Sequence, residues 1–344
     1  MAHPRKNSGK PRAGAYVAAM AQDSSTPGGP LAAALDSVPG TSGRVASARL
    51  AEGTASLVLE VTGLSAHERM TLEADIRDAL SRVADVREVR IAMTAEKPER
   101  TIIAVGSGKG GVGKSTVAAN LAVALSRAGR RIGLVDADIY GPSQPRIMGN
   151  AERPEMADRQ MVAVEAHGVK LLSIGQVAEP GAALAWRGPM AASALGQLID
   201  GDWGDADTLI VDLPPGTRDI QLSLIQKWKP AGAVIVSTPQ DLALIDATRA
   251  IDLFRKMNVP VLGLVENMSG YSCPHCGEVS DPFGAGGAEA AAKVLGIPFL
   301  GRIPLTAAIR AASDAGTPPA AGDGPEGDAF RAVADRLMER IAAL

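Results

Sequence analysis

The sequence predicts an α/β protein in which a mainly parallel, doubly wound sheet follows a small α+β domain. Two observations carry this prediction. From Thr101 onward, short apolar runs alternate with segments of helical periodicity. A glycine-rich motif also joins the first of these runs to the first of these helices. Such alternation is typical of parallel strands whose connecting helices cover both faces of the sheet.

The chain of 344 residues divides into three parts by composition. Residues 1–42 are rich in Gly, Pro, Ser and Ala, so we expect them to be disordered. Residues 43–96 form the small α+β domain, in which 55–61 and 86–91 read as strands and 72–83 as a helix. Residues 97–344 form the large α/β domain.

Seven apolar runs in the large domain have the length and composition of buried strands. They span residues 101–106, 131–136, 169–174, 208–213, 232–238, 260–266 and 298–303. Helices are expected between them, for example over Asp241–Met257, and an amphipathic helix containing Phe330, Val333, Leu337 and Ile341 is expected at the end. Ligands should bind where the strands reach their carboxyl ends.

Composition limits the function. The formal net charge of −3 offers no global basic field for nucleic acid. No apolar run approaches the ~20 residues that span a membrane, and acidic residues offset the arginines of the last helix, so we expect no membrane partner. Only two cysteines occur, which favours a reducing, cytoplasmic setting over a disulfide scaffold.

The glycine-rich motif fits the phosphate-binding P-loop pattern. It reads Gly108-Lys109-Gly110-Gly111-Val112-Gly113-Lys114-Ser115-Thr116. Glycines allow successive backbone N–H groups to turn toward one anion, and the helix that follows adds its unpaired donors. Lys114 should reach the β- and γ-phosphates of ATP, while the Ser115 hydroxyl can bind Mg²⁺.

Three aspartates follow predicted strands and suit a magnesium site. Asp136 and Asp138 lie two residues apart after the second strand, and Asp212 ends the run Leu209-Ile210-Val211 as a Walker B aspartate does. Asp212 and Asp136 should support Mg²⁺ through water. The turn Pro214-Pro215-Gly216 after Asp212 is rigid enough to sense the γ-phosphate.

The P-loop carries a second lysine, Lys109, which its own nucleotide does not need. Lys-Gly-Gly-Val-Gly-Lys-Ser-Thr resembles the deviant P-loop of the MinD/Mrp ATPases. That resemblance implies that Lys109 acts across a homodimer interface on the partner's nucleotide. It also implies that Asp138 contacts the attacking water and that Asn267 reads the adenine edge.

The motif Cys273-Pro274-His275-Cys276-Gly277 is open to several interpretations. The pair could be a thioredoxin-type redox pair, half of a zinc ribbon, or an inert pair. It could also combine with the same pair of a second chain. Four thiolates on a two-fold axis suit either zinc or a 4Fe–4S cluster.

Several motifs together resemble the Mrp/ApbC family of iron–sulfur cluster carriers. They are Trp186-Arg187-Gly188-Pro189-Met190, Asp212 to Thr217, Val265-Glu266-Asn267-Met268-Ser269, the cysteine motif and Phe283-Gly284-x-Gly286-Gly287. The resemblance implies that Cys273 and Cys276 of two chains bind a bridging 4Fe–4S cluster. The chain would then be a homodimeric ATPase that exchanges clusters with scaffold proteins and apo-protein clients.

Two rival functions belong to other classes. A spatial organiser of the MinD/ParA kind would act on membrane or DNA and would not need the two cysteines. A zinc-bridged targeting ATPase would need a long Met- and Leu-rich helical insertion to shield client helices, and residues 145–185 do not provide one.

Overall fold

The computed structural model describes residues 30–64, 66–94, 99–157, 159–177, 188–216, 219–273 and 275–344. Residues 1–29, which we expect to be disordered, lie outside these ranges. So do four residues of the predicted motifs, Trp186, Arg187, Thr217 and Pro274. The chain forms two compact units that divide after Pro98. No helix in the described ranges is long and apolar enough to cross a membrane.

The smaller unit is a three-stranded sheet covered on one face by two helices. Its strands, in the order β1-β2-β3, are β1 (Val45–Ala51), β2 (Thr54–Glu60) and β3 (Glu88–Thr94). β1 pairs antiparallel with β2 through a two-residue turn, in which Glu52 and Gly53 both have positive φ. β3 runs parallel to β2, so the long helix α3 (Ala66–Ser81) makes the crossover.

The helix α2 (Pro30–Asp36) corrects the expectation that residues up to 42 are disordered. Leu31 and Leu35 are buried, and with Val38 they join the same apolar cluster as Leu57 and Leu59 of β2. The composition of this segment suggested disorder because it is rich in Gly, Pro, Ser and Ala and has few large apolar residues. Packing against α3 within the shared apolar cluster supplies the stabilisation that such a short helix lacks by itself.

The larger unit contains a nine-stranded sheet whose seven central strands are parallel, as the sequence predicts. In spatial order the parallel strands are β14 (Phe299–Leu305), β12 (Val261–Ser272), β11 (Gly232–Ser237), β4 (Thr101–Gly106), β10 (Thr208–Asp212), β5 (Ile132–Asp136) and β9 (Val169–Ser173). Two antiparallel strands extend it. They are β8 (Val164–Ala166) beside β9 and β13 (Val279–Ser280), which folds back on the end of β12.

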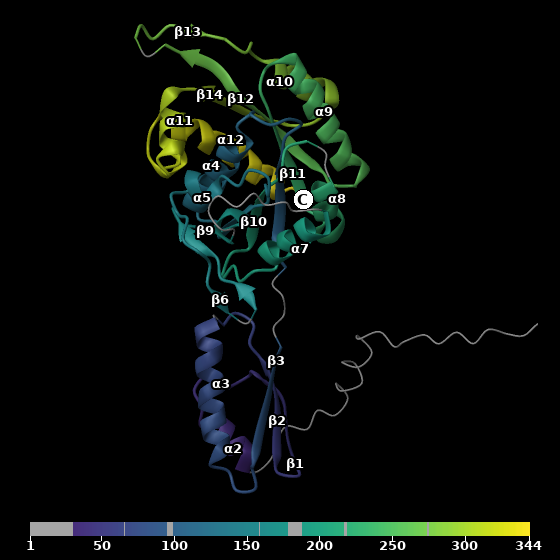
Figure 1. Ribbon diagram of the computed structural model, residues 1–344, viewed down its shortest axis with the longest axis vertical. Helices are drawn as coiled ribbons and strands as arrows, with labels where there is room; N and C mark the ends of the chain where they lie inside the picture. Colours follow the sequence, from purple (N-terminus) through teal and green to yellow (C-terminus); the bar gives the residue numbers. More distant parts are fainter. Residues whose placement is uncertain are drawn as a thin grey trace, which may run out of the picture. The chain divides into compact units, whose positions relative to one another are not determined.

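Helices cover both faces of this sheet (Figure 1). On each face, an apolar cluster of helix and strand residues packs the helices against the sheet. One face is covered by α7 (Gly188–Ile199), α8 (Asp219–Trp228), α9 (Asp241–Lys256) and α10 (Gly287–Leu295). The other is covered by α4 (Lys114–Arg127), α5 (Gln144–Ile147), α11 (Ala307–Asp314) and α12 (Pro325–Ile341). Shorter elements are α6 (Ile174–Val177), η1 (Pro319–Ala321), β6 (Met156–Ala157) and β7 (Gln160–Met161).

The last helix, α12, packs into the body of the larger unit. Phe330, Val333 and Leu337 are almost fully buried and belong to the cluster that contains β14 and α4. The apolar stripe that the sequence predicts is therefore used for packing.

We predict that Leu35→Ala destabilises the smaller unit. Leu35 is 3% exposed within its core, and truncation of a buried leucine typically costs about 2–5 kcal/mol. Hydrogen exchange of the β2 amides in the full chain should accelerate, because Leu35 belongs to the same apolar cluster as Leu57 and Leu59 of β2. Leu50→Ala is the matched control, since Leu50 is 40% exposed. Equal exchange rates in the two variants would contradict the packing of α2.

Candidate functional site

The P-loop connects the end of β4 to the start of α4, as the sequence predicts. Two of its glycines are required by close contacts. A Cβ at Gly108 would lie 2.0 Å from the carbonyl carbon of Asp246 in α9. Gly113 has φ +77° and lies against Asn267, whose Nδ2 would be 2.2 Å from an added Cβ. The loop therefore runs between α9 and β12 with no space for side chains at these two positions.

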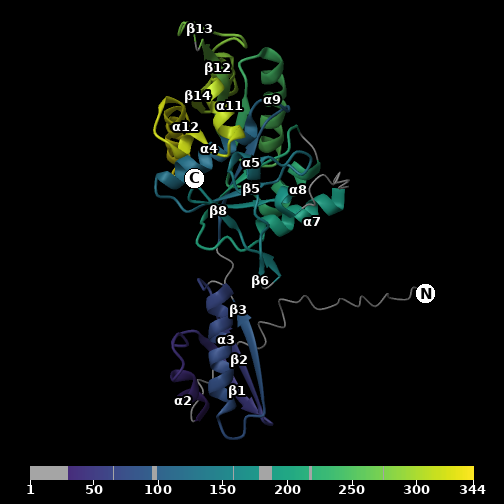
Figure 2. The same ribbon diagram turned by 60° about the vertical axis from the view of Figure 1, so that its left-hand side comes forward.

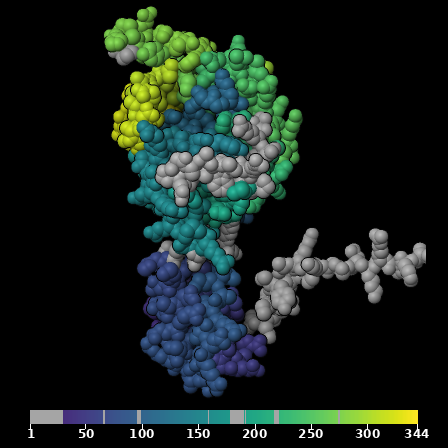
Figure 3. Space-filling view, viewed as in Figure 1, coloured from purple at the N-terminus to yellow at the C-terminus, as the bar shows by residue number. Residues whose placement is uncertain are grey.

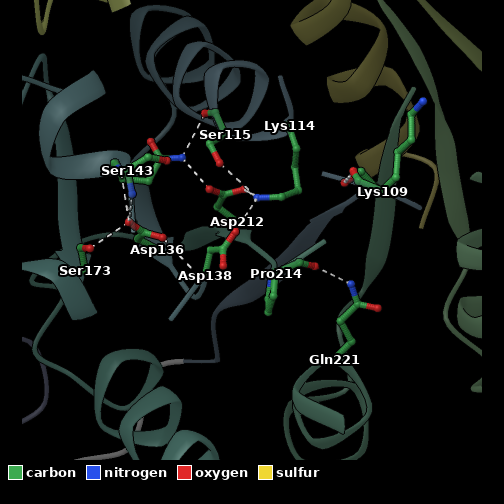
Figure 4. Close-up of polar contacts among 12 residues, drawn as sticks. Lys109, Lys114, Ser115, Asp136, Asp138, Ser143, Ser173, Asp212, Pro214 and Gln221 are labelled. Atoms are coloured by element: carbon green, nitrogen blue, oxygen red, sulfur yellow. Dashed lines mark hydrogen bonds and ion pairs between the residues drawn. The ribbon is translucent and has the colours of Figure 1, made fainter. Parts of the chain in front are cut away.

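The predicted site residues gather where β4, β5 and β10 reach their carboxyl ends (Figure 4). Lys114 is 6% exposed and forms a short ion pair with Asp212 Oδ1. Its Nζ also lies 3.1 Å from Ser115 Oγ and 3.9 Å from Asp138 Oδ2. The structure thus brings together the lysine predicted to contact phosphate, the serine predicted to bind magnesium and two of the three aspartates.

Asp136 has a different environment from the other two aspartates. Its carboxylate is fully buried and accepts hydrogen bonds from Ser143 N, Gln144 N, Ser173 Oγ and Asp138 N, at 2.8–3.2 Å. Burial, followed by the charge of Asp212, raises the pKa of Asp136 to about 7, and the bonds from Gln144 and Ser173 oppose this rise. Asp136 therefore fixes the loop after β5, which carries Asp138.

Asp138 has the environment of a proton acceptor. Its side chain is largely buried, and burial raises its pKa although the charge of Lys114 opposes the shift. Its Oδ1 has no hydrogen-bond partner among the described residues. A carboxylate with a raised pKa and a free oxygen can orient a water and take up its proton.

Sequence reasoning missed two buried glutamines in this site. Gln144, at the start of α5, donates from Nε2 to Asp212 Oδ2 at 2.8 Å and to Ser115 O at 3.0 Å. Gln221 of α8 donates to Pro214 O at 2.7 Å, which holds the turn after β10. Neither glutamine belongs to a motif, and only the folded chain shows that they face the aspartates and the turn.

Lys109 belongs to the P-loop, and Asn267 of β12 contacts it. Lys109 points away from Asp212 (Figure 4), and its Nζ lies 3.5 Å from Gln240 Oε1. Asn267 is 7% exposed within β12 and donates from Nδ2 to Val112 O at 2.8 Å. Its described contact is therefore with the P-loop, and a contact with adenine stays a prediction.

The residues at the carboxyl ends of β4, β5 and β10 are chemically suited to bind ATP and Mg²⁺. The P-loop backbone offers donors to phosphates, and Ser115 offers a hydroxyl beside Lys114. Two buried oxygens in the same region, Asp138 Oδ1 and Gln144 Oε1, lack donors in the described structure. A hydrated cation would supply such donors. Ser115 would bind the cation directly, and Asp212 would hold it through water.

The cysteines lie apart from the aspartates, on a hairpin formed by β12 and β13. This hairpin projects from the end of the sheet in Figures 1 and 2, and its green atoms stand out from the unit in Figure 3. Cys273 directly follows β12 and is half-buried, whereas Cys276 is exposed. Cys273 O accepts a hydrogen bond from Gly277 N, and Cys273 N donates to Glu278 O, which closes the turn.

The turn favours the thiolate form of Cys273. Hydrogen bonds from the backbone of Cys276 and then of His275 lower the pKa of the Cys273 thiol. Thiolate is the form that binds metals. Among the described residues, no group of three or more His, Cys, Asp or Glu side chains could hold a metal ion.

The fold and this edge define a P-loop NTPase of the MinD/ParA type. The chain belongs to the ParA family of NUBPL iron-transfer P-loop NTPases, whose model matches residues 99–338.

Its relatives carry related names. A protein of Deinococcus radiodurans named iron-sulfur cluster carrier protein is 46% identical over 314 residues, which cover 87% of this chain and 89% of its own. A protein of Arabidopsis thaliana named iron-sulfur protein required for NADH dehydrogenase, mitochondrial, is 54% identical over 222 residues, which cover 64% of this chain and 71% of its own.

Solved structures support the fold. A nucleotide-binding protein from Archaeoglobus fulgidus, solved in complex with ADP and with cobalt found in it, is 41% identical with a TM-score of 0.55. The match covers 63% of this chain and 86% of that one. The cell division ATPase MinD of Pyrococcus furiosus is 24% identical with a TM-score of 0.52 over 70% of this chain and 98% of that one, which shows the fold alone.

We predict that Cys273 is alkylated at lower pH in the folded chain than in the urea-unfolded chain. The backbone donors that lower its pKa exist only in the folded turn, so the thiolate forms earlier as pH rises. Iodoacetamide rates across a pH series, read from the Cys273 peptide by mass spectrometry, measure the midpoint. The unfolded chain is the control, and identical midpoints would contradict the described turn.

Proposed function

We propose that this protein is a homodimeric ATPase that binds a bridging 4Fe–4S cluster and transfers it to apo-proteins. The observation that carries the proposal is the pair of thiols at the projecting end of β12. The same strand carries Asn267, which donates to the P-loop and lies six positions before Cys273. The names of the bacterial and plant relatives support a role in handling iron–sulfur clusters. The whole sequence has no cysteines besides this pair.

Each chain would contribute two thiolates to a cluster that needs four. Cys273 is half-buried and Cys276 exposed at the tip of a hairpin that projects from the sheet, where a second hairpin could approach them. The backbone hydrogen bonds that lower the pKa of the Cys273 thiol reduce the cost of the deprotonation that metal binding requires. The exposure of Cys276 leaves the cluster accessible to a client, as transfer requires.

Hydrolysis of ATP would be mainly a matter of positioning and charge. The attacking water would form its bond to the γ-phosphorus as the bond to the ADP oxygen breaks, and Asp138 would orient that water and receive its proton. Lys114 would leave Asp212 to contact the phosphates. Mg²⁺, when bound, neutralises charge on the β- and γ-phosphates.

Lys109 would complete the site of the partner chain. In the single chain it points away from the aspartates, and its contact with Gln240 is at the outer limit of a hydrogen bond. Its side chain is therefore available to the nucleotide site of a second chain. Leu242 and Ile245, at the start of α9 beside Gln240, are exposed apolar residues that a partner could cover.

The position of Lys109 predicts complementation between two inactive variants. Lys109→Ala should bind ATP but lose hydrolysis on the order of 10²-fold, as removal of a transition-state charge typically does. Asp138→Asn should also be inactive. In a mixed dimer, the site of the Lys109→Ala chain keeps its own Asp138 and receives Lys109 from its partner. An equal mixture should therefore recover about a quarter of wild-type turnover.

The control is Lys114→Ala mixed with Asp138→Asn. Lys114 acts on the nucleotide of its own chain, and Asp138 does too, so no mixed dimer contains a complete site. This mixture should stay inactive. If the Lys109→Ala mixture also stays inactive while wild-type chains exchange freely, Lys109 does not act across the dimer.

The cysteines predict a loss of cluster binding without loss of nucleotide binding. Cys273→Ser or Cys276→Ser should remove the brown chromophore after anaerobic reconstitution, because one chain supplies only two thiolates. ATP binding should persist, since the P-loop uses backbone donors on another part of the edge. Ser272→Ala is a matched control beside the pair. Full iron and sulfide in the single cysteine variants would overturn the bridging site.

A further inference from the structure

One buried glutamine belongs to no sequence motif. It lies at the centre of the nucleotide edge, the edge of the sheet that carries the P-loop, Asp138 and Asp212. Gln144 is completely buried at the start of α5. Its Nε2 donates to Asp212 Oδ2 at 2.8 Å and to Ser115 O at 3.0 Å. Both acceptors are oxygens, so the orientation of the amide is determined by its partners. One side chain thus joins the aspartate that ends β10 to the helix start that carries Ser115.

The other half of the same amide has no partner. Gln144 Oε1 is buried and accepts no hydrogen bond from the described residues. A buried oxygen without a donor typically costs about 1–3 kcal/mol. Asp138 Oδ1, in the same region, is also buried without a donor. Two orphaned acceptors, on side chains that contact Asp212, Ser115 O or Lys114, point to donors that arrive with a ligand, as the waters of a hydrated cation do.

The side-chain amide of Gln144 also compensates part of the negative charge of Asp212. Asp212 is fully buried, and Lys114 forms its ion pair. If Lys114 turned to the phosphates of a bound nucleotide, Asp212 would lose that partner. A buried carboxylate left without compensation is strongly destabilising. The hydrogen bond from Gln144 to Oδ2 would then remain, with Oδ1 on the side that Lys114 now occupies.

We propose that Gln144 is a positioning residue for the magnesium ion of the nucleotide complex. Its Nε2 fixes Asp212 by one oxygen, so that the other faces the hydrated metal, and its Oε1 accepts a hydrogen bond from that hydration shell. The inference rests on the proposed binding of ATP with Mg²⁺ and is independent of the cluster. Residues that orient the ligands of a metal typically change metal affinity by about 10–100-fold when they are replaced.

The test separates metal binding from nucleotide binding. Gln144→Met keeps a similar length and removes the amide, while the backbone bond from Gln144 N to Asp136 Oδ2 is retained. A fluorescent ATP analogue is bound to the full chain, first in EDTA and then across a Mg²⁺ series. The affinity in EDTA should stay within about twofold, and the Mg²⁺ concentration for half-maximal tightening should rise by about 10-fold or more.

Gln176→Met is the matched control. Gln176 is also a buried glutamine, 5% exposed, but its Oε1 accepts from Ser173 N and it does not contact Asp212. This variant should keep the wild-type Mg²⁺ dependence. If Gln144→Met does not fold, Gln144→Leu gives the same comparison, and Mn²⁺ binding by electron paramagnetic resonance gives a second measurement.

The outcomes are distinguishable. An unchanged Mg²⁺ dependence in Gln144→Met, or an equal change in Gln176→Met, would overturn the role of Gln144. A parallel loss of affinity in EDTA would also overturn it, because it would show a structural effect on the P-loop. If wild type itself shows no Mg²⁺-dependent tightening of the nucleotide, the proposed binding of ATP with Mg²⁺ is wrong, and the inference about Gln144 is overturned with it.

Discussion

The buried carboxylate of Asp212 is the constraint on which the nucleotide edge depends. It ends the strand between β4 and β5, where no solvent reaches it. A charge in that position must be compensated by nearby groups, and the structure supplies Lys114 from the P-loop and Gln144 from α5. These two partners come from different connections of the sheet. The arrangement of the P-loop, of α5 and of β10 therefore follows from a single requirement.

Asp136 meets the same requirement in another way. It receives four hydrogen bonds and no direct cation, and three of its donors are backbone amides of the loop after β5. That loop carries Asp138, so the stability of one carboxylate determines the position of another. The two aspartates look equivalent in the sequence, two residues apart. Burial and hydrogen bonding give one of them a loop-forming role and leave the other with a free oxygen.

Strand β12 provides a physical connection between the P-loop and the cysteines. Glu266 is fully buried and accepts hydrogen bonds from Ser269 Oγ, Gly286 N, Ala288 N and Arg302 Nε at 2.8–3.2 Å. The next residue, Asn267, holds the P-loop by its amide. The base of the cysteine hairpin is thus fixed to α10, β14 and the P-loop. A ligand that shifts one end of this strand would bias the other, and the coupling would be reciprocal.

The sequence alone was sufficient to predict the features that depend on local residue patterns. Continuous apolar runs identified all seven parallel strands, because strands buried on both faces read in this way. The P-loop and the Walker B aspartate were predictable because their chemistry requires fixed spacing. The strand β1 was missed because Ala48 is its only buried residue, and the helix α2 because it depends on packing within an apolar cluster that residues far along the chain complete. Gln144 was missed for a related reason, since its partners are 29 and 68 positions away.

Native mass spectrometry after anaerobic purification tests the central claim most directly. Four thiolates from two chains should hold one cluster, so the account predicts a mass of two chains plus four iron and four sulfide, about two of each per chain. The cluster should leave when the dimer dissociates. A dimer that holds a single zinc ion and no sulfide, or a single chain that carries a complete cluster, would contradict the account.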